Sequence, residues 1–70
     1  MPNNGPALSA FLDQKNEIDR LLERLQAASA DHFGRHPDEV TWADRDTLDA
    51  YRRILRMLAD RVFKEGEHAR

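Results

Sequence analysis

The residues with the clearest capacity for chemistry are His32 and His36, which stand four positions apart among acidic neighbours. Two histidines at this spacing on one helix can share a zinc ion. Gly34 and Pro37, however, break a helix between the histidines and after them. The sequence therefore predicts structural roles, with His32 near the negative end of a helix dipole and His36 in the following turn. We expect no metal site and no cofactor.

Catalytic chemistry has weaker support. The carboxylate pairs Asp44 with Asp46, and Glu65 with Glu67, could act as acid and base only in surroundings that separate their pKa values, which requires burial. No serine or threonine is accompanied by a plausible base and orienting acid, and no glycine-rich phosphate loop is present. A short helical chain also offers little concave volume for a substrate. We expect a protein that is not an enzyme and has no small-molecule substrate.

Four arginines form the best candidate for contact with phosphate groups, because arginine binds phosphate through two parallel hydrogen bonds. They are Arg45, Arg52, Arg53 and Arg56. Asp49 lies four residues from both Arg45 and Arg53, and Asp60 lies four residues from Arg56, so ion pairs along one helix can neutralise much of this charge. The net charge of −2 does not favour a phosphate backbone either. A solvated, ion-paired face is the favoured interpretation.

The elements that carry these residues are two helices, because apolar residues recur at steps of three and four in two segments. The first helix is predicted over about 7–33 and the second over about 42–65. The apolar positions of the first are Leu8, Phe11, Ile18, Leu21, Leu22, Leu25 and Ala28. Those of the second are Leu48, Tyr51, Leu55, Leu58 and Val62, widened by Ala50, Ile54, Met57 and Phe63.

Stop and start signals join the two segments. Gly34 suits the left-handed position just after a helix, and residues 37–40 suit a short connector helix that begins with Pro37. Thr41 is a good N-cap for the second helix, with Asp44 three residues further on. We expect a single domain over 7–66, flanked by a disordered tail over 1–6 and a frayed tail over 67–70.

The short joint predicts an antiparallel helical hairpin. In this arrangement Leu21 lies near Ile54, and Phe33 lies beside Trp42. Phe33, Gly34 and Trp42 would then be the structural anchors of the closed end, with the tryptophan filling it.

A hairpin of 70 residues without a cysteine has a small core and no disulfide to support it. The apolar face of the second helix is also wider than one partner helix covers. A second copy of the chain could cover the remainder, giving a dimeric four-helix bundle. The residues expected at this dimer or partner interface are Leu22, Ala50, Ile54 and Met57.

The amino-terminal residues have no basic segment followed by an apolar core, and no apolar run is long enough to span a membrane. The expected location is the cytoplasm, without a membrane partner.

Several short runs resemble a family of small, all-helical bacterial proteins of uncharacterised function that often accompany plasmids and other mobile elements. The runs are Asp31-His32-Phe33-Gly34, His36-Pro37-Asp38-Glu39-Val40, Trp42-Ala43-Asp44, Thr47-Leu48 and Phe63-Lys64-Glu65-Gly66-Glu67-His68-Ala69. The resemblance implies a helical fold and no activity, cofactor or site residue.

Taken together, these features predict a small, non-catalytic protein-protein interaction or accessory module that acts as a homodimer. A larger protein is a further candidate partner. Two alternatives stay open. One is an accessory protein that contacts nucleic acid through the arginines, and the other is an inhibitor that imitates phosphates with its carboxylates to block a host nucleic-acid-processing complex.

Overall fold

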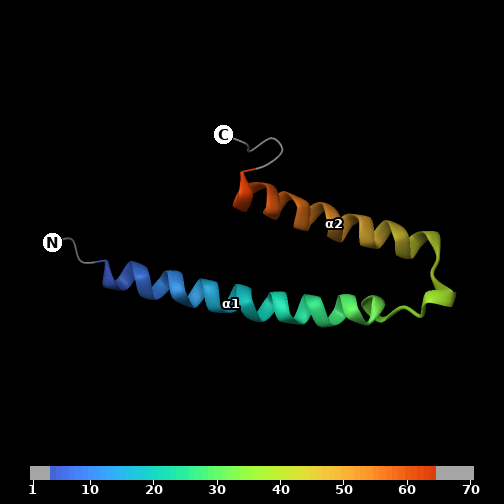
Figure 1. Cartoon of the computed structure of the whole chain (residues 1–70), viewed down its shortest axis with the longest axis horizontal. Helices are drawn as coiled ribbons and strands as arrows, with labels where there is room; N and C mark the ends of the chain where they lie inside the picture. The colour runs from blue at the N-terminus through green and yellow to red at the C-terminus, as the bar shows by residue number, and fades with distance from the viewer. Residues whose placement is uncertain (1–3, 65–70) are drawn as a thin grey trace. The chain divides into compact units, whose positions relative to one another are not determined.

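The computed structural model describes residues 4–64 of the chain. Its elements, in order, are α1 (Gly5–Ala30), the 3₁₀ turn η1 (His32–Gly34), the 3₁₀ turn η2 (Pro37–Glu39) and α2 (Trp42–Phe63) (Figure 1). No strand occurs within residues 4–64, which confirms the all-α class. The chain divides into two units, Met1–Pro37 with α1 and Asp38–Arg70 with α2.

Helix α1 begins at Gly5, two residues earlier than the sequence indicated. Pro6 is tolerated there because the first turn of a helix has no internal partner for the N–H that proline lacks. Asn4 holds the N-cap position without a capping bond from its side chain, and its carbonyl accepts a bond of 2.7 Å from the Leu8 N–H. Residues 5 and 6 are thus helical and do not belong to a disordered tail. Residues 1–3 lie outside the described part of the chain.

Helix α1 also ends earlier than expected, at Ala30 and not at Phe33. The Asp31 N–H is shared between the carbonyl oxygens of Ala27 and Ala28, at 3.2 and 3.1 Å. Such shared bonds are common where the last turn of a helix tightens.

The residues after this end explain the shorter helix. Gly34 has a φ of 80°, so its predicted left-handed conformation is confirmed, but His32 and Phe33 have φ values of 53° and 54° as well. A left-handed conformation costs an ordinary residue roughly 1–2 kcal/mol, so two of them side by side were not expected. The bonds from the Gly34 N–H to the Asp31 carbonyl and from the Arg35 N–H to the His32 carbonyl hold the turn, at 3.0 and 3.1 Å.

Helix α2 begins where the sequence placed it. The turn η2 starts at Pro37, as expected for the connector, and Thr41 is the N-cap of α2. The Thr41 hydroxyl oxygen accepts a bond from the Asp44 N–H at 3.2 Å, while the Asp44 carboxylate accepts one from the Thr41 N–H at 3.0 Å. This capping box satisfies two backbone donors that the start of a helix otherwise leaves without partners.

Helix α2 ends at Phe63, followed by Lys64 in a left-handed conformation with a φ of 55°. The Lys64 N–H donates to the Asp60 carbonyl, and Arg61 brings positive charge to the last turn. That charge is favourable beside the negative end of the helix dipole. The predicted extension to residue 65 and the frayed tail over 67–70 lie outside the described residues.

Candidate interaction surfaces

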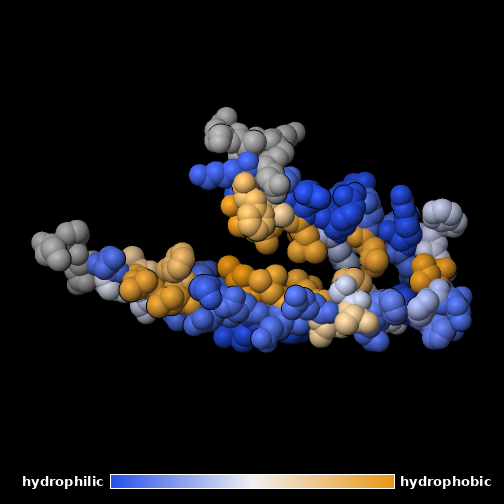
Figure 2. Space-filling view, in the orientation of Figure 1, coloured by the Kyte–Doolittle hydropathy of each residue, from blue (hydrophilic) through white to orange (hydrophobic). Residues whose placement is uncertain are grey.

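Each helix carries an apolar stripe that its own unit leaves uncovered, and the stripe of α1 is interrupted at Gln14 and Lys15. Figure 2 shows hydrophobic side chains gathered along one side of α1 and one side of α2. We call the positions Leu48, Tyr51, Leu55, Leu58 and Val62 the main stripe of α2. Its side chains expose between 42% of their surface, at Leu48, and 61%, at Val62. No residue within 4–64 is buried, so these surfaces can gain hydrophobic stabilisation only from a further packing partner.

The expected interface residues are among the exposed ones. Ile54 exposes 65% and Met57 61% of their surface, and Ala50 beside them is exposed as well. Leu22, on α1, is also exposed. The three residues of α2 follow one another at steps of four and three, so they lie on one side of the helix next to the main stripe.

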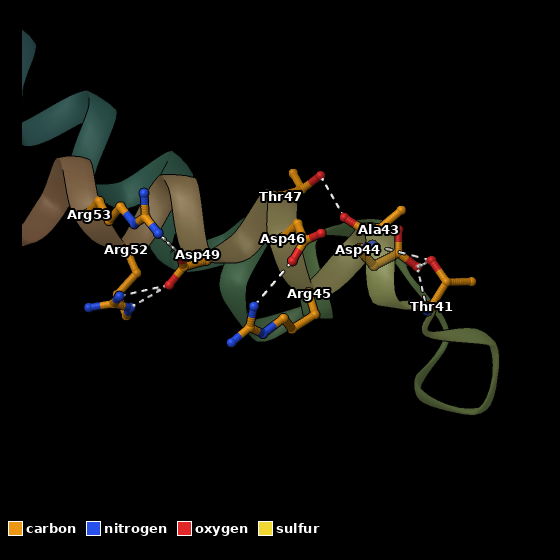
Figure 3. A network of polar contacts seen from close by, with 9 residues as sticks. All are labelled: Thr41, Ala43, Asp44, Arg45, Asp46, Thr47, Asp49, Arg52 and Arg53. Carbon is orange, nitrogen blue, oxygen red and sulfur yellow. Dashed lines mark hydrogen bonds and ion pairs between the residues drawn. The ribbon is translucent and has the colours of Figure 1, made fainter.

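The four arginines lie on α2 close to carboxylates, and Figure 3 shows Arg45, Arg52 and Arg53 with their partners. Arg52 donates to one Asp49 oxygen through Nε at 3.1 Å and Nη2 at 2.7 Å, and Arg53 Nη2 lies 2.8 Å from the other oxygen. Arg45 Nη1 lies 3.2 Å from Asp46. Both carboxylate oxygens of Asp49 therefore bind a guanidinium group.

Arg56 has the loosest of these ion pairs, with its Nη1 lying 3.9 Å from Asp60 Oδ1. The predicted pairs of Asp49 with Arg53 and of Asp60 with Arg56 are confirmed. The expected pair of Asp49 with Arg45 does not form: Arg45 contacts its neighbour Asp46, and Asp49 binds Arg52, three residues on, neither of which we expected. Spacing of three residues is as favourable as four on a helix surface, and this is the signal that would have found the Asp49–Arg52 pair.

This arrangement changes the acidity of Asp49. The hydrogen bonds from Arg52 hold the pKa of the Asp49 carboxyl below its ordinary value of 3.8. Burial opposes this lowering, and the positive charges of Arg53, Arg52 and Arg45 lower the pKa by smaller amounts. The Asp49 side chain is only 21% exposed because the two arginines cover it. It stays ionised at neutral pH and keeps the neighbouring guanidinium groups occupied.

The three expected anchors differ in exposure. Phe33 is half-buried, whereas Trp42 exposes 81% of its surface at the first position of α2. Gly34 carries the left-handed turn, and a Cβ built on it would meet no atom within 4 Å. The backbone conformation at position 34 therefore requires a glycine, whereas close packing does not. The filling of a closed hairpin end by Trp42 stays a prediction.

The two histidines of the joint lie in different conformations. His32 belongs to the left-handed turn η1, and His36 lies between η1 and η2, so they do not share one helix face. Within residues 4–64, no three histidine or acidic side chains come together in a group able to hold a metal ion.

Neither α1 nor α2 has the length and the apolar composition that a helix needs to cross a bilayer.

Comparisons with protein-family models, with characterised proteins and with solved structures found no match. The resemblance to the small bacterial proteins accordingly stays a prediction from the residues.

Proposed function

We propose that this protein is a small, non-catalytic interaction or accessory module that acts as a homodimer. In this proposal α1 and α2 pack as an antiparallel hairpin, and two hairpins form a four-helix bundle. The observation that carries the proposal is the exposure of the apolar stripes, with Ile54 and Met57 more than 60% exposed on a helix that is polar on its other side. The proposal retains the cytoplasmic location expected from the sequence.

The two helices depend on packing for their stability. Isolated helices are marginal in water, and most helical stability in proteins comes from packing of an apolar face. Burying a large apolar side chain contributes roughly 1.5–3 kcal/mol, so an uncovered stripe forgoes most of the stabilisation available to this chain. An antiparallel α1 would cover the main stripe of α2. The adjacent positions Ala50, Ile54 and Met57 would then be available to a second copy.

The state of the arginines supports an interaction module over a nucleic-acid accessory protein. Each of Arg45, Arg52, Arg53 and Arg56 already has a carboxylate partner on the same helix. Phosphates are negatively charged like these carboxylates. Phosphate binding would therefore have to break the ion pairs or share each arginine between a carboxylate and a phosphate. A titration of the protein into labelled duplex DNA at low salt tests this point, and tight, salt-sensitive binding would favour the nucleic-acid alternative.

Self-association is tested by size-exclusion chromatography with light scattering on the full chain. We expect a mass of about twice the 8.1 kDa of one chain. Ile54→Gln should shift the protein towards the monomer, because it places an amide in the apolar contact. Arg56→Gln introduces the same side chain on the charged side of α2 and should leave the dimer intact. A wild-type chain that is helical, unfolds cooperatively and stays monomeric would refute the proposal.

A further inference from the structure

Helix α2 carries a second line of positions beside its main stripe, which we call the flank seam. These positions alternate in steps of four and three, the spacing of the seam of a coiled coil. The flank seam consists of Ala43, Thr47, Ala50, Ile54, Met57 and Arg61. All six are exposed. Small side chains occupy its amino-terminal half and large ones its carboxy-terminal half.

The charges of α2 follow the same polarity. The amino-terminal half, residues 42–52, holds the acids Asp44, Asp46 and Asp49 with two arginines, whereas the carboxy-terminal half, residues 53–63, holds three arginines with Asp60 as its single acid. Two such helices side by side place opposite charges together only if they run in opposite directions.

Arg61 gives this polarity a specific role. It occupies the last position of the flank seam, and within residues 4–64 it makes no ion pair. Burying a guanidinium group in a helix contact is costly unless an acidic partner lies nearby. An antiparallel second copy brings Asp44 and Asp46, near the start of its α2, to this position, whereas a parallel copy brings a second arginine.

We propose that a second copy of this chain docks on the flank seam as an antiparallel helix, in the register that sets Ala50 opposite Ile54 of the partner subunit. This inference rests on the proposed function and specifies the partner and geometry of the same surface. Thr47 then faces Met57 of the partner subunit, and Ala43 faces Arg61 of the partner subunit. The contact has twofold symmetry, so each pair occurs twice.

The side-chain sizes fit this register. Each alanine of the seam meets a large side chain of the other copy, so small and large residues interdigitate and the two helices approach closely. In a parallel pair, Ala50 would face Ala50 of the partner subunit and Ile54 would face Ile54 of the partner subunit. Such a pair has a gap at the alanine level and crowding at the isoleucine level.

Disulfide trapping tests the register, because the chain contains no cysteine of its own. The variants Ala50→Cys and Ile54→Cys are mixed and equilibrated in a glutathione redox buffer, and the mass of each disulfide dimer is measured. In the proposed register a cysteine at position 50 faces one at position 54, within bridging distance. In the same register, two cysteines at the same position, one in each copy, are displaced from each other by about 6 Å along the helix axis. We expect the mixed disulfide to exceed each homodisulfide about tenfold.

Three results would overturn the inference. Predominance of the homodisulfides would indicate a parallel pair, a statistical mixture of all three would indicate contact without a fixed register, and absence of cross-linking would place another surface in the contact. Light scattering on the wild-type chain separates these outcomes from failure of the proposed function. A wild-type dimer with the wrong cross-links contradicts only the antiparallel seam, whereas a folded wild-type monomer contradicts both.

Arg61→Glu provides an independent test that does not use a cysteine. It sets a glutamate against Asp44 and Asp46 of the partner subunit at both ends of the contact, so the dimer dissociation constant should rise about tenfold. Adding Asp46→Lys should recover at least half of that loss on a logarithmic scale. An unchanged dissociation constant in Arg61→Glu would contradict the register.

Discussion

Replacement of Thr41 by alanine tests how the start of α2 is specified. The Thr41 hydroxyl group accepts a bond of 3.2 Å from the Asp44 N–H and donates one of 3.1 Å to the Asp44 carboxylate, and alanine removes both. The reciprocal bond from the Thr41 N–H to Asp44 Oδ2, at 3.0 Å, needs only the backbone of residue 41 and should persist. Replacing a threonine at the N-cap by alanine typically costs about 1 kcal/mol, and we expect Thr41→Ala to lower the free energy of unfolding by that amount.

The assay is urea unfolding of the full chain, followed by circular dichroism at a fixed protein concentration, since association would otherwise change the apparent stability. Hydrogen exchange at the Asp44 amide gives a local readout and should accelerate in Thr41→Ala. Thr41→Ser keeps the hydroxyl group and is the matched control. Asp44→Ala removes the other half of the box, and because the two residues bond to each other, the double variant should lose less than the sum of the single losses. Equal stability of Thr41→Ala and Thr41→Ser would refute this account of the helix start.

Three further predictions concern charge and backbone conformation. Because the pKa of Asp49 is lowered, the contribution of its ion pairs to stability is complete above the ordinary value of 3.8 and is lost as the pH falls through the lowered value. Urea unfolding should therefore show that Asp49→Asn is less stable than wild type at neutral pH, and the difference should vanish in strong acid. His32→Gly should raise the free energy of unfolding by about 1 kcal/mol, because it relieves a φ of 53° in an ordinary residue, and an unchanged midpoint in thermal unfolding would count against the left-handed turn. Gly34→Ala should lower the free energy of unfolding by about 1 kcal/mol through conformation alone, since the added Cβ meets no atom within 4 Å; loss of much more would indicate a steric clash.

The start of α2 could be predicted from the sequence because its cause is local. Thr41 and Asp44 need only each other and the backbone between them, and Pro37 sets the connector by its own ring. The end of α1 could not be predicted as well. The apolar pattern continues through Phe33, and the left-handed conformations of His32 and Phe33 depend on the bonds of the whole turn, although the tendency of histidine towards positive φ was a weak signal.

The candidate surfaces show the same division between local and distant causes. Ion pairs within α2 follow from spacing along one helix, so the pairing of Asp49 with Arg53 was predictable. The Asp49–Arg52 pair has a spacing of three residues, whereas the expected pairs have a spacing of four. The identity of the side chains that cover Ile54 and Met57 depends on packing between helices, for which the sequence of one chain supplies a pattern and not a contact.

Oxidation of Met57 by hydrogen peroxide tests most directly whether the exposed side of α2 is a contact surface. Its side chain lies on the flank seam with 61% of its surface exposed, and formation of the sulfoxide requires access of the oxidant to the sulfur. The rate is measured by mass spectrometry across the micromolar range of protein concentration, relative to free methionine. Our account predicts that Met57 becomes protected as the concentration rises and that Ile54→Gln abolishes this protection. An oxidation rate equal to that of free methionine at every concentration would contradict it.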